Sequence, residues 1–271
     1  MNGCIMNILI QEPVIRIGSF VLIFTALAFA ETRKPRRSLS VSKKARWFPN
    51  LALTLINAGI LRLLMPVVPV GMALICSERG WGLLNTYPVP PGIAIVAGVI
   101  ILDFVIYLQH VLFHNVPLFW RIHRMHHTDL DVDVTTGFRF HPFEIILSLL
   151  IKLAAVTAFG PPAVAVLLFE VLLNGTSMFN HSNLRLPVQL DRILRLLVVT
   201  PDMHRVHHSV IIHETNSNYG FNLPWWDRLL ETYRPQPAKG HEGMTIGLAR
   251  FRNPEELTLG KLLKLPWSER L

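Results

Sequence analysis

The chain carries few charged residues for its length. Of its 271 residues only 16% are Asp, Glu, Lys or Arg, whereas 51% are hydrophobic. Soluble globular domains usually carry about 25% charged residues, so this composition is typical of a protein embedded in a membrane. The net charge of +8 is spread over connecting segments and forms no basic stripe interleaved with aromatic residues. We therefore expect no nucleic-acid partner.

Cysteine is nearly absent, and several common cofactor motifs are missing. Cys4 and Cys76 lie far apart and form no Cys-x-x-Cys pair, which excludes a zinc ribbon, a thioredoxin-like motif and a disulfide framework. The chain also lacks the His-Glu-x-x-His motif of zinc proteases, the Gly-x-Gly-x-x-Gly dinucleotide fingerprint and the Cys-x-x-Cys-His haem motif. Any electrons that it uses must therefore come from elsewhere.

Long apolar runs are present instead. Seven positive charges between Arg33 and Arg46 follow the first run directly, which favours an anchoring helix over a cleaved signal peptide. Pro66 and Pro69 are expected to kink the second run. The last two runs are short for a span of about 20 residues, so they form a hairpin that either crosses the bilayer or only enters it. The five expected spans are residues 17–30, 51–75, 92–113, 145–160 and 163–179.

The distribution of charge predicts how these spans are oriented. The basic segment 33–46 should be cytoplasmic, and the loop 76–91, with only two charged residues, should lie outside. The third span then delivers His110 and His114 to the cytoplasmic face, and the hairpin returns His181 to the same face. We predict an all-α integral membrane helical bundle with a cytoplasmic histidine-rich helical cap, in a bacterial inner membrane or the endoplasmic reticulum.

Eight of the twelve histidines form three dense boxes. Neutral imidazole is the commonest nitrogen ligand for transition metals, and residues three or four apart share one face of a helix. Each box therefore presents two or three rings to one point, and three boxes can enclose a pair of metal ions. The boxes are His110-x-x-x-His114, His123-x-x-His126-His127 and His204-x-x-His207-His208.

The remaining histidines are separate. His181 follows the fifth span at the same expected depth as the boxes and is a candidate metal ligand. His141 precedes a helix-starting proline, so it is expected either to ligate metal or to cap that helix. His213 and His241 are expected in loops. The segment 216–220 is interpreted as a turn, with a weak metal ligand or a donor to a ligand as the alternative role of Asn218.

Asp103 lies on the same stripe of the third span as the first box, because Asp103, Tyr107, His110 and His114 follow one another at spacings of 4, 3 and 4. A carboxylate within a span is costly and usually faces the protein interior. We expect Asp103 to orient a histidine ring from behind. The alternative is a buried carboxylate that hydrogen-bonds neighbouring helices.

The boxes, together with the segments 139–144, 200–208 and 218–228, resemble the fatty acid hydroxylase/sterol desaturase superfamily over roughly residues 95–235. The resemblance implies an integral membrane oxygenase with a non-haem dinuclear centre. Some members carry a further histidine where this chain has Ser177, which would leave one metal with an open or water-filled position. The ligands that the resemblance implies are His110, His114, His123, His126, His127, His181, His204, His207 and His208.

Ligand type alone fits iron, zinc or copper. The resemblance indicates two iron ions, with zinc as the alternative, and O₂-dependent hydroxylation or desaturation of a sterol or acyl lipid from the membrane. A separate ferredoxin, b-type cytochrome or reductase would supply electrons. The basic residues expected either to dock an acidic carrier or to contact lipid headgroups are Arg185, Arg192, Arg195 and Arg205.

Two other functions remain open. A membrane zinc hydrolase could use Glu144 or Asp202 as its base, although nine ligands are too many for one catalytic zinc. A metal transporter would need more polar residues through its spans. The chain divides into N-terminal membrane helices with a basic loop (1–90), a catalytic domain (91–235) and a C-terminal cytoplasmic tail (236–271). Within the tail, residues 257–265 either lie on the membrane surface or pack on the catalytic region.

Overall fold

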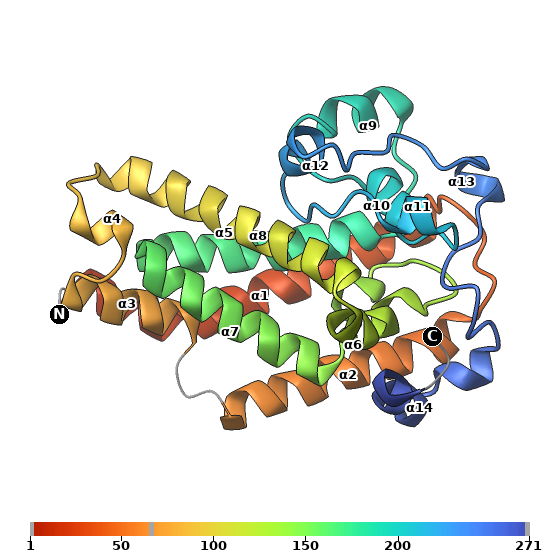
Figure 1. Cartoon of the computed structure of the whole chain (residues 1–271), viewed down its shortest axis with the longest axis horizontal. Coiled ribbons are helices and arrows are strands. Elements are labelled where there is room, and N and C mark those ends of the chain that lie inside the picture. Colours follow the sequence, from red (N-terminus) through yellow and green to blue (C-terminus); the bar gives the residue numbers. More distant parts are fainter. Residues whose placement is uncertain (1–2, 65–67, 269–271) are drawn as a thin grey trace.

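The structure is a computed structural model and describes residues 3–64 and 68–268. Within these ranges the chain forms helices and no strand, so the expected all-α fold is confirmed. Most of the long helices run along the longest axis of the molecule, and most of the short ones gather at one end (Figure 1). The long helices are α1 (Gly3–Arg33), α2 (Lys43–Leu64), α3 (Pro69–Arg79), α5 (Pro91–Asn115), α6 (Pro117–His127), α7 (Pro142–Phe159) and α8 (Ala163–His181).

Shorter elements complete the end of the molecule that carries the histidines. They connect or cover the long helices there, apart from α4, which lies at the opposite end (Figure 1). These elements are α4 (Leu83–Thr86), η1 (Thr136–Phe138), α9 (Val188–Leu194), α10 (Pro201–His207), α11 (Ile212–Thr215), α12 (Trp225–Leu229), α13 (Gly240–Gly243), η2 (Pro254–Leu257), α14 (Leu259–Lys264) and η3 (Leu265–Trp267).

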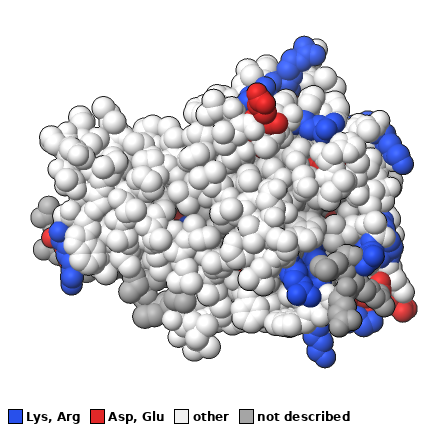
Figure 2. Space-filling model, in the orientation of Figure 1, with Lys and Arg blue, Asp and Glu red and all other residues white. Residues whose placement is uncertain are grey.

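Five helical segments are long and apolar enough to cross a membrane. They are Gln11–Arg33, Lys43–Thr86, Pro91–Asn115, Pro142–Phe159 and Ala163–His181. They correspond in order to the five spans that the sequence predicts. Figure 2 shows a broad surface without charge between two charged ends, and most of the charge gathers at the end with the short helices. A membrane would cover the uncharged band.

The second span differs from the expectation of one kinked helix. Its residues fall on α2 and α3, and Pro69 begins α3 instead of bending a continuous helix. Proline is favoured in the first turn because its missing N–H has no partner there in any case. Pro66 lies outside the described residues. The same preference starts α5, α6, α7 and α10, each of which has proline in its first turn.

The turn between α7 and α8 makes the expected hairpin. Gly160 ends α7 with a left-handed φ of 61°, a conformation that costs glycine little because it has no Cβ. Two prolines follow, and α8 begins at Ala163. The chain thus reverses within a few residues, and α8 runs back along α5 and α1 towards the histidine end (Figure 1).

The amphipathic stretch 257–265 packs on the catalytic region. Leu262 and Leu265 are fully or nearly fully buried and form one apolar cluster with Leu53 of α2 and Met125 of α6. Of the two alternatives for this stretch, the structure therefore shows packing against the protein. The tail covers the helix that carries the second histidine box.

A buried ion-pair network fixes the loop between α6 and α7. The guanidinium of Arg46, in the first turn of α2, donates to Asp129 Oδ1 at 2.7 Å and to Asp133 Oδ2 at 2.5 Å. It also donates to the backbone oxygen of Asp131 at 2.9 Å. All of these side chains are buried. The network holds the chain that directly follows His127.

Candidate metal centre

Nine of the histidines meet at the end of the bundle in two groups. In each group one ring nitrogen per residue lies within 4.8 Å of the corresponding nitrogen of every other member, and all nine rings are buried. The rings come from α5, α6, α8 and the α10 region. The first group is His110, His114, His123, His127 and His207, and the second is His126, His181, His204 and His208.

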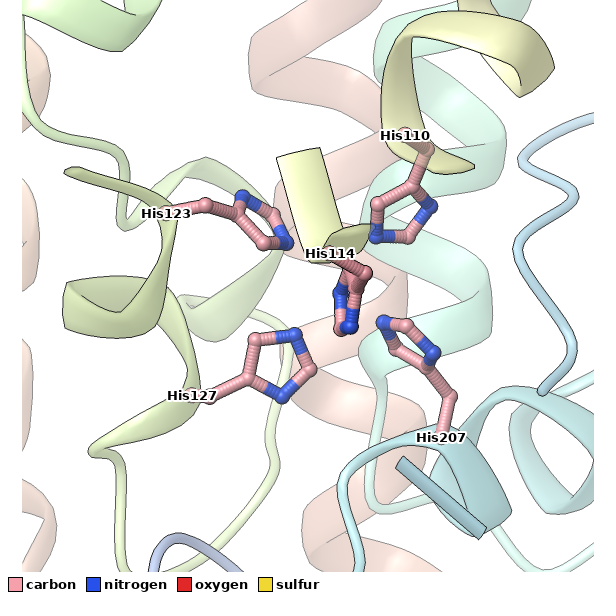
Figure 3. A group of neighbouring side chains, drawn as sticks. All are labelled: His110, His114, His123, His127 and His207. Atoms are coloured by element: carbon pink, nitrogen blue, oxygen red, sulfur yellow. The ribbon is translucent and has the colours of Figure 1, made fainter. Parts of the chain in front are cut away.

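The second and third boxes are each divided between the two groups, whereas both rings of the first box belong to the first group. Consecutive residues on a helix point about 100° apart, so His126 and His127 fall in different groups although they are adjacent. His207 and His208 are divided in the same way. In Figure 3 the five rings of the first group come from three helices and point toward one shared space. Each group has enough imidazoles for one transition-metal ion.

Two rings of the first group are held from behind by the backbone. His110 Nδ1 lies 2.7 Å from the carbonyl oxygen of Tyr219, and His207 Nδ1 lies 2.7 Å from that of Ser217. A carbonyl oxygen can only accept, so both rings carry their proton on Nδ1. Their Nε2 atoms then present lone pairs, and both are buried without a partner in the described part of the chain.

Two further rings of this group are held by side chains. His114 Nδ1 lies 3.2 Å from Asn216 Oδ1, and His123 Nδ1 lies 2.7 Å from Glu144 Oε1. Their Nε2 atoms are likewise buried and have no partner among residues 3–64 and 68–268. Buried polar atoms are normally paired. A cluster of unpaired lone pairs aimed at one space is therefore what a metal ion would satisfy.

The second group shows the same pattern more sharply. His181 Nδ1 donates to Ser177 O at 2.7 Å, and His126 Nδ1 donates to Arg139 O at 3.3 Å. The Nε2 atoms of these two rings are only 3.1 Å apart. Since each proton is already on Nδ1, two lone pairs face one another, which is repulsive unless a cation lies beside them. His204 Nε2 also lies 3.1 Å from His181 Nε2.

Burial keeps these rings in the form that binds metals. It lowers the pKa of His123 to about 3. Burial and the neighbouring rings also lower the pKa of His127 and His207 well below the usual range. Neutral imidazole is the ligating form. The donor set, its protonation and its unpaired nitrogens together fit two metal ions.

The structure does not bring every predicted residue to these groups. His141 caps α7: its Nδ1 accepts from the N–H of Phe143 at 3.2 Å, and its Nε2 lies 3.2 Å from Leu263 O. This is the capping alternative, and His141 belongs to neither group. Ser177 lies at the second group, where its backbone oxygen holds His181 and its hydroxyl donates to Gly137 O at 2.6 Å.

Asp103 does not orient a histidine. Its Oδ2 accepts from the indole N–H of Trp226 at 2.8 Å and from the backbone N–H of Leu223 at 3.3 Å. The expectation that Asp103 lies behind a ring of the first box was therefore wrong, and the alternative of a bond to a neighbouring helix is closer. The carboxylate anchors the segment that leads back to Tyr219. That segment holds His110 through its backbone.

The proposed basic surface is smaller than expected. Arg195 is buried and pairs with Asp191 at 2.6 Å. Arg205 is also buried and pairs with Asp202, which also accepts from Arg36 at 3.0 Å. These two arginines stabilise the fold and are not free to dock a carrier. Arg185 and Arg192 remain exposed.

Sequence reasoning identified a turn at residues 216–220 but missed that this turn holds rings of the first group. Asn216, Ser217 and Tyr219 each hold one of its rings, two of them through backbone oxygens. Asn218 has a positive φ of 52° and donates to Met203 O at 2.9 Å, so its turn role is confirmed. A backbone acceptor leaves no signature in the side-chain sequence.

A cavity of about 470 Å³ opens beside the first group, and His110 and His123 form part of its wall. Most of the lining is apolar and comes from α1, α2, α5, α7 and α8. The cavity extends to Lys152, eight residues after Glu144 on α7, and therefore about 12 Å along the helix. A long apolar molecule could thus reach the metal centre from within the membrane.

Glu144 provides a test of ring positioning at the first group. We expect Glu144→Gln to lower the affinity for one of two metal ions about 10- to 100-fold, because the carboxylate fixes the tautomer and direction of His123. Metal retained during titration with a chelator measures this. Glu144→Asp keeps the carboxylate but shortens the side chain, so the metal affinity of this variant should fall between those of wild type and Glu144→Gln. Equal metal retention in wild type and Glu144→Gln would contradict the assignment.

A sequence model of the fatty acid hydroxylase family matches residues 95–232, half of the chain, and this range includes all nine grouped histidines. The chain belongs to the fatty acid hydroxylase family. The family region thus contains α5 to α12, while α1, α2 and the C-terminal tail lie outside it. No solved structure matches the chain significantly.

Curated relatives of this fatty acid hydroxylase family member match over 55–64% of the chain. Ornithine lipid hydroxylase OlsE of Rhizobium tropici is 30% identical over 59% of this chain and 48% of its own length. Alkylglycerol monooxygenase of Homo sapiens is 27% identical over 55% of this chain and 32% of its own length. Methylsterol monooxygenase 2-2 of Arabidopsis thaliana is 25% identical over 64% of this chain and 67% of its own length. The chain spans about half or less of the length of the first two.

Proposed function

We propose that this protein is a membrane-bound oxidoreductase that uses two histidine-ligated iron ions and O₂ to hydroxylate or desaturate a sterol or acyl lipid. The observation that supports it most is the convergence of buried, unpaired imidazole nitrogens into two adjacent groups. The family relatives named hydroxylase or monooxygenase favour a redox metal over zinc. A membrane lipid is the proposed substrate.

The iron ions, when bound, would activate O₂, which is the oxidant that attacks a C–H bond. The protein's own residues do the rest. Helices α1, α2, α5, α7 and α8 enclose the apolar cavity that holds the lipid and excludes water. The backbone oxygens of Tyr219 and Ser217 and the side chain of Glu144 keep the rings aimed inward. His110 and His123 belong both to the metal group and to the cavity wall, so substrate and metal would meet there.

The zinc hydrolase is less well supported. Asp202, one of its candidate bases, is engaged by Arg36 and Arg205, and Glu144 holds His123. Two groups of ligands also exceed what one catalytic zinc needs. Lipid oxidation by O₂ instead consumes electrons at the metal centre. We propose that a separate ferredoxin, b-type cytochrome or reductase supplies these electrons. The exposed Arg185 and Arg192 are the remaining basic candidates for its docking.

The placement in the membrane is also part of the proposal. The charged end of the molecule, which contains the histidine groups, faces the cytoplasm, because basic residues resist translocation. The division into membrane helices (1–90), catalytic domain (91–235) and cytoplasmic tail (236–271) is retained. The membrane is a bacterial inner membrane or the endoplasmic reticulum.

Metal analysis combined with lipid mass spectrometry tests the function. Purified protein should contain two iron ions per chain. Membranes that contain it should convert a lipid to a product with one added oxygen or two fewer hydrogens only when O₂ and a reductant are both present. Stoichiometric zinc with O₂-independent lipid cleavage would instead support the hydrolase. Movement of metal across vesicles without lipid turnover would support a transporter.

A further inference from the structure

Two buried amide groups in the cavity wall have oxygens without a partner. Asn57 of α2 donates through Nδ2 to Phe140 O at 2.9 Å, and Gln109 of α5 donates through Nε2 to Ser148 Oγ at 3.1 Å. Both side chains are at least nine-tenths buried, and both line the cavity. Asn57 Oδ1 and Gln109 Oε1 have no hydrogen-bond partner among the residues that the structure describes.

The orientation of the Asn57 amide follows from its anchor. Phe140 offers a carbonyl oxygen, which can only accept, so the Asn57 nitrogen must face it and the Asn57 oxygen is left over. A buried acceptor without a partner is destabilising, and such atoms are rare in native proteins. A cavity meant only for a hydrocarbon chain would leave both oxygens unpaired in the complex as well.

These acceptors lie close to the metal centre. Gln109 directly precedes the grouped His110, so their Cα atoms are about 3.8 Å apart. Ser148, which anchors Gln109, is one helical turn beyond Glu144, whose carboxylate holds His123. The polar patch therefore occupies the part of the cavity nearest to the first histidine group.

The charged groups at the other end of the cavity are already satisfied. Glu170 of α8 pairs with Lys152 of α7 at 2.9 Å and with Arg16 of α1 at 3.2 Å. These pairs join α1, α7 and α8 and require no ligand. Among the described residues, the buried polar atoms of the lining that lack a hydrogen-bond partner thus lie beside the histidines and are acceptors.

We propose that Asn57 and Gln109 bind a hydrogen-bond-donating group of the lipid substrate, a hydroxyl or an amide N–H, and so place a carbon near that group at the first histidine group. This deepens the proposed function, on which it rests, by naming a specificity subsite. The oxidised carbon then lies in the polar half of the lipid, and the apolar tail extends along the cavity toward Lys152. Asn57 lies outside the region shared with the family.

Binding without turnover provides the first test. Iron-loaded protein is kept free of O₂, and its thermal unfolding is measured with 1-dodecanol and with the methyl ether of the same chain, which accepts but cannot donate. A ligand at free concentration L that binds only the folded state stabilises it by RT ln(1 + L/Kd), so at equal concentration the tighter ligand gives the larger rise in Tm. The alcohol should bind at least about tenfold more tightly than the ether, since only it satisfies the acceptors.

Three variants separate the subsite from general effects on the cavity. Asn57→Leu and Gln109→Met remove the acceptors at nearly constant volume and should bring the alcohol-to-ether preference close to one. Ile145→Val changes an apolar lining residue of the same cavity and should leave the preference intact. Iron content confirms that each variant is folded, and Gln109→Met gives an independent result where Asn57→Leu fails to fold.

The position of the oxidised carbon provides the second test. Fragmentation of the product by mass spectrometry should place the new oxygen or double bond in the half of the lipid that carries the donor. Equal binding of alcohol and ether by wild type, as expected if water fills the patch, overturns the inference, and so does oxidation in the terminal half of the tail. Alcohol preference without any oxidised product would retain the subsite and refute the proposed function.

Discussion

Replacing His181 and His204 together by alanine should remove one of two bound iron ions and abolish lipid oxidation. Both rings belong to the group of four, and their Nε2 atoms lie 3.1 Å apart. Without them, two imidazoles remain in that group, which is too few to retain a divalent ion against water and chelators. The five rings of the other group are untouched, so its ion should stay. Iron per chain, measured after gel filtration, gives the result.

The matching variant on the other side replaces His114, His127 and His207 by alanine, which likewise leaves two imidazoles in the first group. It should remove the other ion and leave the group of four intact, so the two variants should each retain one iron ion per chain, and each should be inactive. His213 is exposed and belongs to neither group, so His213→Ala should keep both ions and full turnover. Two retained ions in either of these variants would refute the division of the histidines.

The meeting of the boxes could be predicted from the sequence, but the division of the nine histidines into groups of five and four could not. The apolar runs predict where the helices lie, and the distribution of charge predicts that the boxes lie at the same end of them. Adjacent histidines such as His207 and His208 look equivalent in a motif. They belong to different groups because consecutive helical side chains diverge, and the direction of each depends on how α10 is placed against α5 and α6.

The interactions behind the rings were the least predictable part. Asp103 and His141 both had plausible local reasons to serve the metal, yet Asp103 contacts Trp226, a residue 123 positions later, and His141 caps its own helix. The ring of His110 is instead held by a backbone oxygen. Such partners depend on long-range chain closure, which neither spacing nor composition reveals.

One positioning device did have a sequence signal. Asp129, Asp131 and Asp133 form an alternating acidic run directly after the second box, in a chain with few acidic residues, and a basic segment precedes the second span. Pairing between them is the simplest way to neutralise both near the membrane. The structure shows that Arg46 provides it, with Asp129 and Asp133 as the partners.

Arg46→Leu should therefore destabilise the protein by about 3–5 kcal/mol, the usual cost of leaving buried charge without its partner. Asp129 and Asp133 are at most 1% exposed and would have no solvent to compensate for the loss. Thermal unfolding of the purified, iron-loaded protein measures the change. Lys44→Leu removes an exposed charge two residues away and should change stability by no more than about 0.5 kcal/mol.

The pH dependence of stability in Arg46→Leu shows whether the lost charge causes the destabilisation. Burial alone would raise the pKa of Asp129, but the charge and hydrogen bonds of Arg46 overcome this and hold that pKa at about 2. An unfolded aspartate titrates near about 3.9, so the pair contributes its stability above that pH and loses it as the pH falls toward 2. In Arg46→Leu the pKa of Asp129 rises, and the remaining stability should become sensitive to acid at a higher pH. Parallel Tm curves for variant and wild type below pH 6 would show that the guanidinium acts through packing instead of through its charge.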